Sequence, residues 1–173
     1  MKRDLPAPLA APLAAAAAEA VRIEKDFLGE KAVPADAYYG VQTLRGKENF
    51  HITGLPMSIE PAFVQAFGYV KKAAALANRD LGVLEAKVAD AIAAACDRLI
   101  AGEMRDQFVT DFIQGGAGTS TNMNANEVIA NLALELLGHK KGEYAVVNPN
   151  DHVNFGQSTN DVYPTAFRLA LIM

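Results

Sequence analysis

The sequence predicts a mainly α-helical fold with a small β/loop segment before the first helix. Apolar side chains recur every three to four residues after Pro61, with Phe63 and Phe67 one turn apart, as in a helix that packs on a core. The stretch 22–46 instead contains short β-prone pieces between turn-forming residues, which favour loops and one small hairpin. With 173 residues, 51% of them hydrophobic, the chain is long enough for one domain with its own core.

Four helices are expected, and each has a recognisable start or stop. Proline suits the first turn of a helix, and glycine is preferred just after the last turn. Hydroxyl residues that follow a glycine-rich turn can open a helix as N-caps. The expected helices cover residues 61–81, 85–101, 120–137 and 164–173, with the third beginning at Ser120 or Thr121.

The last of these helices is almost wholly apolar from Phe167 to Ile172. A helix that is apolar on every side must be buried. We therefore expect residues 21–160 to form a helical domain and residues 161–173 to be the truncated start of an element that belongs to a larger core.

Residues 1–20, MKRDLPAPLAAPLAAAAAEA, differ from the rest because alanine and proline dominate them. Lys2 and Arg3 followed by an apolar stretch faintly resemble a signal peptide. However, Asp4 interrupts the charged end and three prolines interrupt the apolar run, so a disordered extension is favoured over a targeting segment.

Composition excludes several classes of function. A net charge of −4 and a pI of about 5.4 leave no excess of basic residues for a nucleic-acid partner. No run of about 18 apolar residues lacks a charge, so no contact with a membrane is expected. The histidines His51, His139 and His152 lack ligand spacing, so no metal site is expected. Cys96 lies on an apolar helical stripe and is expected to be buried, and a single cysteine is consistent with a cytoplasmic protein.

Two polar segments stand out in this alanine-rich chain. The first polar segment is residues 114–124, QGGAGTSTNMN, and the second polar segment is residues 157–161, QSTND. Each puts hydroxyls, a carboxamide and backbone N–H groups beside the expected start of a helix. Such a helix end carries partial positive charge and N–H groups without intrahelical partners, so it favours anions. Two of them in one chain predict a site for a small dicarboxylate or a phosphate.

Each polar segment also allows other interpretations. A nucleotide-binding loop would require glycine where Thr121 stands, or lysine where Thr119 stands, so both nucleotide patterns fail. A glycine-rich turn followed by a helix cap leaves Asn122, Asn124 and Asn126 unexplained, because asparagine is a poor helix former. That row predicts either buried polar packing or a site. Taken alone, the second polar segment would be a cluster of N-cap residues.

Several unusual strings resemble the aspartase/fumarase superfamily. They are QGGAGTSTNMNANEVIAN and GHKKGEYAVVNPNDHVNFGQSTNDVYPTAFRLA, and upstream RIEKDFLGEKAVPADAYYGVQTLRGKENF is similar to the start of the aspartate ammonia-lyases. Fumarases of the superfamily typically carry TGSGTQTNMN-like and SSND strings, so GGAGTSTNMN and STND favour the aspartases. The resemblance covers residues 22–173. It implies the N-terminal helical domain of the aspartase/fumarase fold, followed by the start of its central helix bundle.

The same resemblance implies an activity and a set of site residues. Aspartases convert L-aspartate to fumarate and ammonia without a cofactor, as homotetramers whose sites are shared between subunits. Thr119, Ser158 and Thr159 would donate hydrogen bonds to substrate carboxylate oxygens, and Asn160, with Thr119, would lie near the amino group. The implied substrate-binding residues, with two backbone positions included, are Gly118, Thr119, Ser120, Ser158, Thr159 and Asn160.

A second carboxylate site is implied around residues 148–151, NPND. Asn148, Asn150 and Asp151 match a stretch that forms such a site in fumarases, although fumarases usually carry histidine where Asn148 stands. By itself this string is also a common turn sequence.

The resemblance places the catalytic base beyond Met173. In this family a serine on a GSSxMPxKxN-like loop takes the proton and a histidine in a GRTHLQ-like segment contributes, and neither string occurs in these 173 residues. His152, the nearest substitute, is expected to be a structural histidine beside Asp151 and Asn154. Two alternatives stay open: a class II fumarase-like lyase, and a catalytically silent fragment that acts only as a folding or interaction domain.

Overall fold

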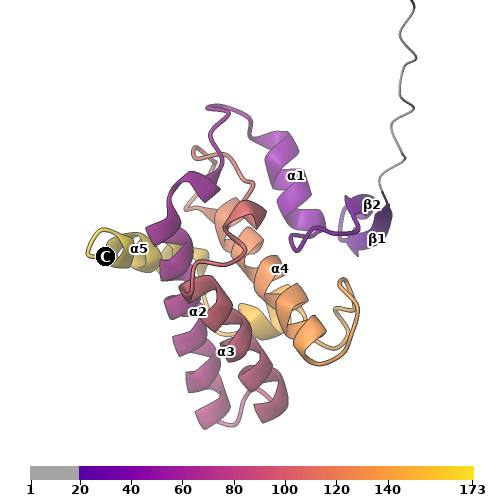
Figure 1. Cartoon of the computed structure of the whole chain (residues 1–173), viewed down its shortest axis with the longest axis vertical. Helices are drawn as coiled ribbons and strands as arrows, with labels where there is room; N and C mark the ends of the chain where they lie inside the picture. The colour runs from indigo at the N-terminus through magenta and orange to yellow at the C-terminus, as the bar shows by residue number, and fades with distance from the viewer. Residues whose placement is uncertain (1–19) are drawn as a thin grey trace, which may run out of the picture.

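The computed structural model describes residues 20–173, which form a helical body with a two-stranded hairpin at one side (Figure 1). The extension expected at residues 1–20 lies outside the described residues, apart from Ala20. Two strands and five α-helices follow in chain order: β1 (Val21–Asp26), β2 (Gly29–Pro34), α1 (Val41–Asn49), α2 (Pro61–Asp80), α3 (Ala86–Ile100), α4 (Thr119–Leu136) and α5 (Thr159–Ala170). Short helical turns at Met57–Ile59, Arg105–Gln107 and Pro149–Val153 connect them. The mainly helical fold is therefore confirmed.

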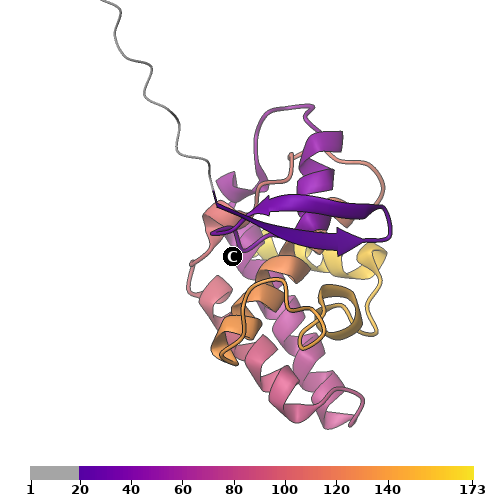
Figure 2. The same ribbon diagram turned by 90° about the vertical axis from the view of Figure 1, so that its right-hand side faces the viewer.

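The expected hairpin is present as an antiparallel pair in which Val21 faces Pro34 and Asp26 faces Gly29. Its turn is closed by Gly29, whose φ of 112° is accessible to glycine at little cost. Figure 2 shows the hairpin running across one side of the helical body. The two turn residues, Phe27 and Leu28, are both exposed at its tip.

The core is built by α2, α3 and α4. Figure 1 shows α2 and α3 side by side as a helical pair, with α4 packed against α3 and against α1. Phe67 on α2, Ile92 on α3 and Ile129 on α4 are each completely buried in the same cluster. Cys96 also lies in this core, as expected, and burial raises the pKa of its thiol to about 12. Its side chain therefore packs as a small apolar group.

Helix α1 lies where the sequence indicated only loops and a hairpin, so that expectation was incomplete. Its N-cap, Gly40, offers no side chain, and no acidic residue lies in its first turn. The missing cap comes from a distant helix: Glu127 on α4 accepts hydrogen bonds from the backbone N–H groups of Gly40, Gln42 and Thr43 at 2.8, 2.9 and 2.9 Å. Such a cap cannot be inferred from the local sequence.

A second buried carboxylate completes the same helix end. Glu24 on β1 accepts from the N–H of Val41 at 2.8 Å and is paired with Arg22 at 2.7 Å. Burial raises the pKa of Glu127 to about 7, while its hydrogen bonds from Thr43 act in the opposite direction. The first four N–H groups of α1 are thus satisfied by two carboxylates, which also suit the positive end of a helix.

Helix α5 begins at Thr159, five residues before the expected start at Pro164. Ser158 is the N-cap, with extended backbone, and Pro164 lies inside the helix. Proline removes one backbone N–H donor but fixes a φ that a helix accepts, so an early proline need not mark the first turn. Beyond the buried Ala166, the helix end is apolar and exposed, with Ile172 83% accessible.

Among residues 20–173, none of the helices combines the length and the hydropathy needed to span a bilayer.

The capping of α1 leads to a stability prediction. Glu127→Gln keeps the side-chain size but turns one acceptor oxygen into an N–H donor that faces the N–H groups of α1. We expect the free energy of unfolding to fall by about 2–4 kcal/mol, the usual cost of breaking a buried charged hydrogen-bond group. Urea unfolding followed by circular dichroism measures it. The control is Glu135→Gln, an exposed position of the same helix, and equal effects of the two variants would contradict the capping role.

Candidate functional site

The first polar segment forms a tight loop that delivers the chain into α4. Gly118 is the N-cap of α4 and has a φ of 83°, and the side chain of Gln114 closes the loop. Its Oε1 accepts from the N–H of Thr121 at 2.8 Å, and its Nε2 donates to the Thr121 hydroxyl. The loop is therefore fixed at both ends by contacts made within the segment.

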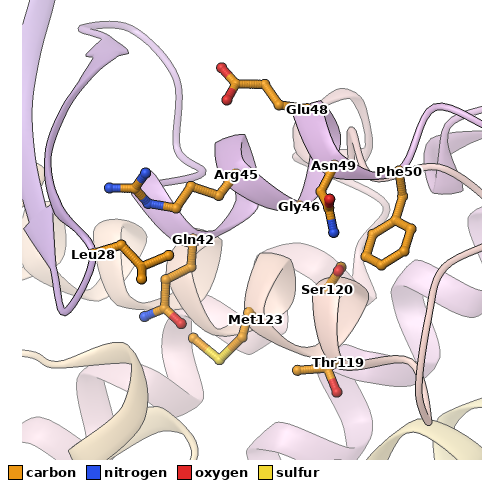
Figure 3. A pocket seen from close by; sticks show the side chains of 10 residues that line it. All are labelled: Leu28, Gln42, Arg45, Gly46, Glu48, Asn49, Phe50, Thr119, Ser120 and Met123. Atoms are coloured by element: carbon orange, nitrogen blue, oxygen red, sulfur yellow. The ribbon is translucent and has the colours of Figure 1, made fainter.

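Thr119 and Ser120 occupy the first turn of α4 and open on a cavity of about 620 Å³ between α4 and α1. Figure 3 shows Ser120 directed toward the α1 residues Gly46 and Asn49, with Thr119 at the end of the helix below it. Neither hydroxyl has a hydrogen-bond partner among residues 20–173, so both are free to bind a ligand. A side chain at Gly46 would approach Ser120 to 3.1 Å, which explains the close packing of the two helices.

The second polar segment forms the start of α5. Ser158 is exposed at the N-cap, and Thr159 is half-buried at the first helical position. Asn160 lines a separate cavity of about 450 Å³ that it shares with Gly118 and Tyr163. Thus Thr119 and Ser120 line one cavity and Gly118 and Asn160 line another, whereas Ser158 and Thr159 line neither of the two.

The two polar segments meet at two contacts. The side-chain Nδ2 of Asn122 donates to the Thr159 hydroxyl at 3.2 Å. On the outer side, the ring of Tyr163 lies against Gly118 so closely that an added Cβ would be 2.0 Å from Cδ2 of the ring. Tyr163 is in turn packed edge-on against Phe63 of α2, with ring centroids 5.2 Å apart. The two polar segments are therefore joined within this chain by Asn122 and Thr159 and by Gly118 and Tyr163.

A buried polar cluster lies beneath the second polar segment. Lys71 on α2 has no exposed surface and donates to Asn154 Oδ1 and to Gln157 Oε1, both at 2.9 Å. Burial lowers the pKa of Lys71 to about 7. Asn154 Oδ1 also accepts from Asn122 and Asn126 of α4, at 3.1 and 3.2 Å. The cluster ties α2, α4 and the loop before α5 together.

The residues implied for a second carboxylate site lie elsewhere. Asn148, Asn150 and Asp151 line a cavity of about 740 Å³ beside the hairpin and Tyr144. Asn148 Oδ1 already accepts from the N–H groups of Asn150 and Asp151, at 2.8 and 3.0 Å, as in an ordinary turn. His152 Nδ1 accepts from the N–H of Asn148 at 3.0 Å, which gives it the structural role expected.

Sequence reasoning missed Lys71, Gln114 and Tyr163. A signal for Lys71 did exist, because it lies four residues after Phe67 on the apolar stripe of α2, where a lysine needs a buried partner. The roles of Gln114 and Tyr163 depend on tertiary contacts and leave no comparable trace. Within the described part of the chain, no three His, Cys, Asp or Glu side chains are grouped to hold a metal ion.

Comparison with known proteins assigns the fold and these segments to a class. A family model described as a lyase matches residues 29–173, and the chain belongs to this lyase family. It is 62% identical to the aspartate ammonia-lyase of Pseudomonas aeruginosa over 152 residues, covering 88% of this chain and 32% of the relative. The aspartate ammonia-lyase of Escherichia coli K12 is 59% identical over 152 residues, covering 87% of this chain and 32% of the relative. The chain thus spans about a third of the length of these relatives.

Solved structures agree with the helical fold. The fumarate lyase:delta crystallin of Brucella melitensis in native form superposes with a TM-score of 0.87 at 57% identity, over 88% of this chain and 36% of that one. The class II fumarase of Schistosoma mansoni gives a TM-score of 0.83 at 39% identity, over 89% and 32% of the two chains. The chain therefore has the N-terminal part of the fumarate lyase fold.

The cost of a clash between Gly118 and Tyr163 can be separated from the cost of backbone strain by comparison with the glycine at the other end of α4. Gly138, after the end of α4, has a φ of 81°, close to the 83° of Gly118, but an added Cβ there meets nothing within 4 Å. Gly138→Ala should therefore cost only the backbone strain, about 1 kcal/mol. Gly118→Ala should cost about 1–3 kcal/mol more, because the ring must move.

Thermal or urea unfolding measures both variants. Repeating Gly118→Ala in a Tyr163→Ala background should remove most of the excess. Equal costs at the two glycines would show that the ring does not confine the loop.

Lys71 predicts a pH dependence of stability. Its pKa is lowered from 10.5 to about 7 on folding, so between those values the unfolded chain holds a proton that the folded chain releases. Stability attributable to Lys71 is therefore lowest below pH 7 and rises toward pH 10. We expect Lys71→Met to remove a rise on the order of 1–4 kcal/mol. Unfolding at several pH values tests this, and Lys72→Met, at an exposed neighbour paired with Asp97, should leave the rise in place.

Proposed function

We propose that residues 20–173 supply part of the substrate site of an aspartate ammonia-lyase, which forms fumarate and ammonia from L-aspartate. The observation that carries the proposal is the contact between Asn122 and Thr159, which joins the hydroxyl-bearing starts of α4 and α5. Two relatives about 60% identical are named aspartate ammonia-lyases. The site supports this reaction because it offers uncharged donors at two helix N-termini, where negative charge is favoured.

The chemistry explains why hydroxyls suit such a site. Removal of the proton next to the side-chain carboxylate moves negative charge onto that group, and the intermediate is a doubly charged aci-carboxylate. Donors already aimed at those oxygens lower the barrier, each by about 100- to 1000-fold in rate. Hydroxyls and amides bind a dianion without competing as bases.

We assign the roles as follows within this proposal. Thr119, Ser158 and Thr159 donate to the carboxylate oxygens, and Asn160 binds the amino group. The backbone N–H groups at Gly118 and Ser120 assist at the start of α4. The separate group at Asn148, Asn150 and Asp151 serves as a second carboxylate site.

The remainder of the site comes from outside these residues. The base serine belongs to a loop beyond Met173, and no cofactor takes part. The exposed apolar end of α5, including Phe167 and Leu171, fits burial in the central bundle of a homotetramer. L-Aspartate and fumarate are the small-molecule partners of that assembly.

A complete lyase provides the test. In the Pseudomonas aeruginosa relative, the matching third of the chain is replaced by residues 20–173. Fumarate formed from excess L-aspartate is then followed by its ultraviolet absorbance. Turnover is expected in the exchanged lyase and not in the purified 173-residue chain, which lacks the base. Malate formed from fumarate in place of aspartate turnover would favour the fumarase alternative. Turnover of neither substrate would favour the silent fragment.

Thr119→Val tests the donor role within that complete lyase. Valine keeps the shape but removes one donor to the developing charge, so kcat/KM for L-aspartate should fall about 100- to 1000-fold. Steady-state rates at limiting and saturating aspartate measure the loss, with Thr165→Val at an exposed position of α5 as the matched control. An unchanged kcat/KM would remove Thr119 from the assigned role.

A further inference from the structure

A series of buried hydrogen bonds leads from α2 to the Thr159 hydroxyl, and its direction is set at its first member. Lys71 Nζ donates to Asn154 Oδ1 and to Gln157 Oε1, both at 2.9 Å, and it carries N–H donors for both oxygens whether it is protonated or neutral. On its other side, Asn154 Nδ2 donates to the backbone carbonyl of Gln157 at 3.0 Å, and a carbonyl can only accept. If the Asn154 amide were turned over, its NH2 group would face the donor Nζ of Lys71. Its oxygen would then face the backbone carbonyl of Gln157, which is also an acceptor.

The orientation of Asn122 follows from that of Asn154. Asn122 Nδ2 lies 3.1 Å from Asn154 Oδ1 and 3.2 Å from the Thr159 hydroxyl, and it donates to both. The reverse orientation would place two amide oxygens face to face. The Asn122 carbonyl oxygen has no hydrogen-bond partner among residues 20–173, so no contact on that side sets the orientation. Asn154 therefore determines which face Asn122 presents to Thr159.

The consequence falls on the Thr159 proton. A hydroxyl carries one donor and two acceptor lone pairs, and here one lone pair is taken by Asn122. The proton of Thr159 must point away from Asn122. Thr159 is half-buried at the start of α5, next to the exposed Ser158, so part of its side chain is accessible to a ligand.

We propose that Asn122 is a positioning residue that keeps the Thr159 hydroxyl oriented as a donor to a carboxylate oxygen of the substrate. This inference rests on the proposed function. It adds to that function a reason why Thr159 acts as a donor: the sense of its hydrogen bond is imposed by Lys71 through Asn154 and Asn122. A hydroxyl whose proton has no partner in the chain requires an acceptor on the ligand. In the proposed reaction that acceptor is a carboxylate oxygen.

The contact itself can be tested in the 173-residue chain, without any activity. A double-mutant cycle is built from Asn122→Ala, Thr159→Val and the double variant. The unfolding equilibrium constant is measured for each. A coupling of about three- to tenfold is expected for one buried hydrogen bond. Asn124→Ala with Thr159→Val is the matched control, because Asn124 is equally buried on α4 but bonds the backbone of Val109 and Gln107. The control cycle should show coupling below about twofold.

The direction of the bond is tested in the complete lyase described above. Asn122→Asp offers only acceptors, so Thr159 would donate to it and lose its donor function in the site. We expect kcat/KM for L-aspartate to fall as far as it does in Thr159→Val, about 100-fold, and the double variant to fall no further. If Asn122→Asp caused general structural damage instead, its loss in kcat/KM would multiply with that of Thr159→Val in the double variant. Asn124→Asp serves as the control for a buried acidic substitution.

Should Asn122→Asp fail to fold, Asn122→Ala replaces it. That variant frees the Thr159 hydroxyl to rotate, so a smaller loss is expected, and it should vanish in a Thr159→Val background. Losses that multiply, or no coupling in the 173-residue chain, would overturn the positioning role. A complete lyase that turns over no aspartate with residues 20–173 unaltered would instead overturn the proposed function and, with it, donation by Thr159 to that substrate.

Discussion

The structure depends on one constraint: α4 is buried along nearly its whole length although it carries a row of polar side chains. A buried amide or carboxylate without a partner costs about 1–3 kcal/mol, so each of these side chains must find a hydrogen-bond partner elsewhere in the chain. Glu127 caps α1, and Asn124 bonds the backbone of the turn before the first polar segment. Asn131 donates to the carbonyl of Tyr38 and accepts from the N–H of Gly142. One helix therefore specifies the position of several surrounding segments.

The same constraint accounts for the shape of the candidate site. Thr119 and Ser120 open α4 beside a cavity, while Asn122 and Asn126 further along the helix are directed inward toward α5 and the loop before it. Because Asn122 belongs to both the opening turn and the buried row, the support of the site and the core of the fold are continuous. Rigid support of this kind is what preorganised hydrogen-bond donors require, since donors that must first reorient contribute less to lowering a barrier.

Much of the fold was predictable because α2 and α3 carry apolar side chains at helical spacing over 15 or more residues each, and because a glycine-rich turn and Gly138 mark the two ends of α4. Helix α1 was not predictable, since its nine residues include Gly46 and its cap is supplied by Glu24 and Glu127. The start of α5 was misplaced because Pro164 was taken as the first turn. For α1, the deciding interactions join residues far apart in the chain.

The candidate site shows the same division. Its hydroxyls were recognised beside the expected helix starts, and the two polar segments together were predicted to form a site for a small dicarboxylate or a phosphate. Their mutual orientation was not predictable, because it depends on which way Asn154 and Asn122 turn their amides and on the ring of Tyr163. Lys71 was overlooked although a lysine on an apolar stripe is unusual. Local patterns identified the chemical groups, whereas their arrangement depends on tertiary contacts.

The span of the α4 contacts has a consequence for how the chain folds. Gly40 and Glu127 are separated by 87 residues, and Tyr38 and Asn131 by 93. Contacts between such distant residues require the closure of long loops, which slows folding relative to a helical bundle of local contacts. Helices α2 and α3, joined by a short turn, can pair early, but the hairpin and α1 must wait until α4 has emerged from the ribosome. During synthesis the hairpin and α1 therefore remain open to chaperones and proteases for longer than the segment that follows them.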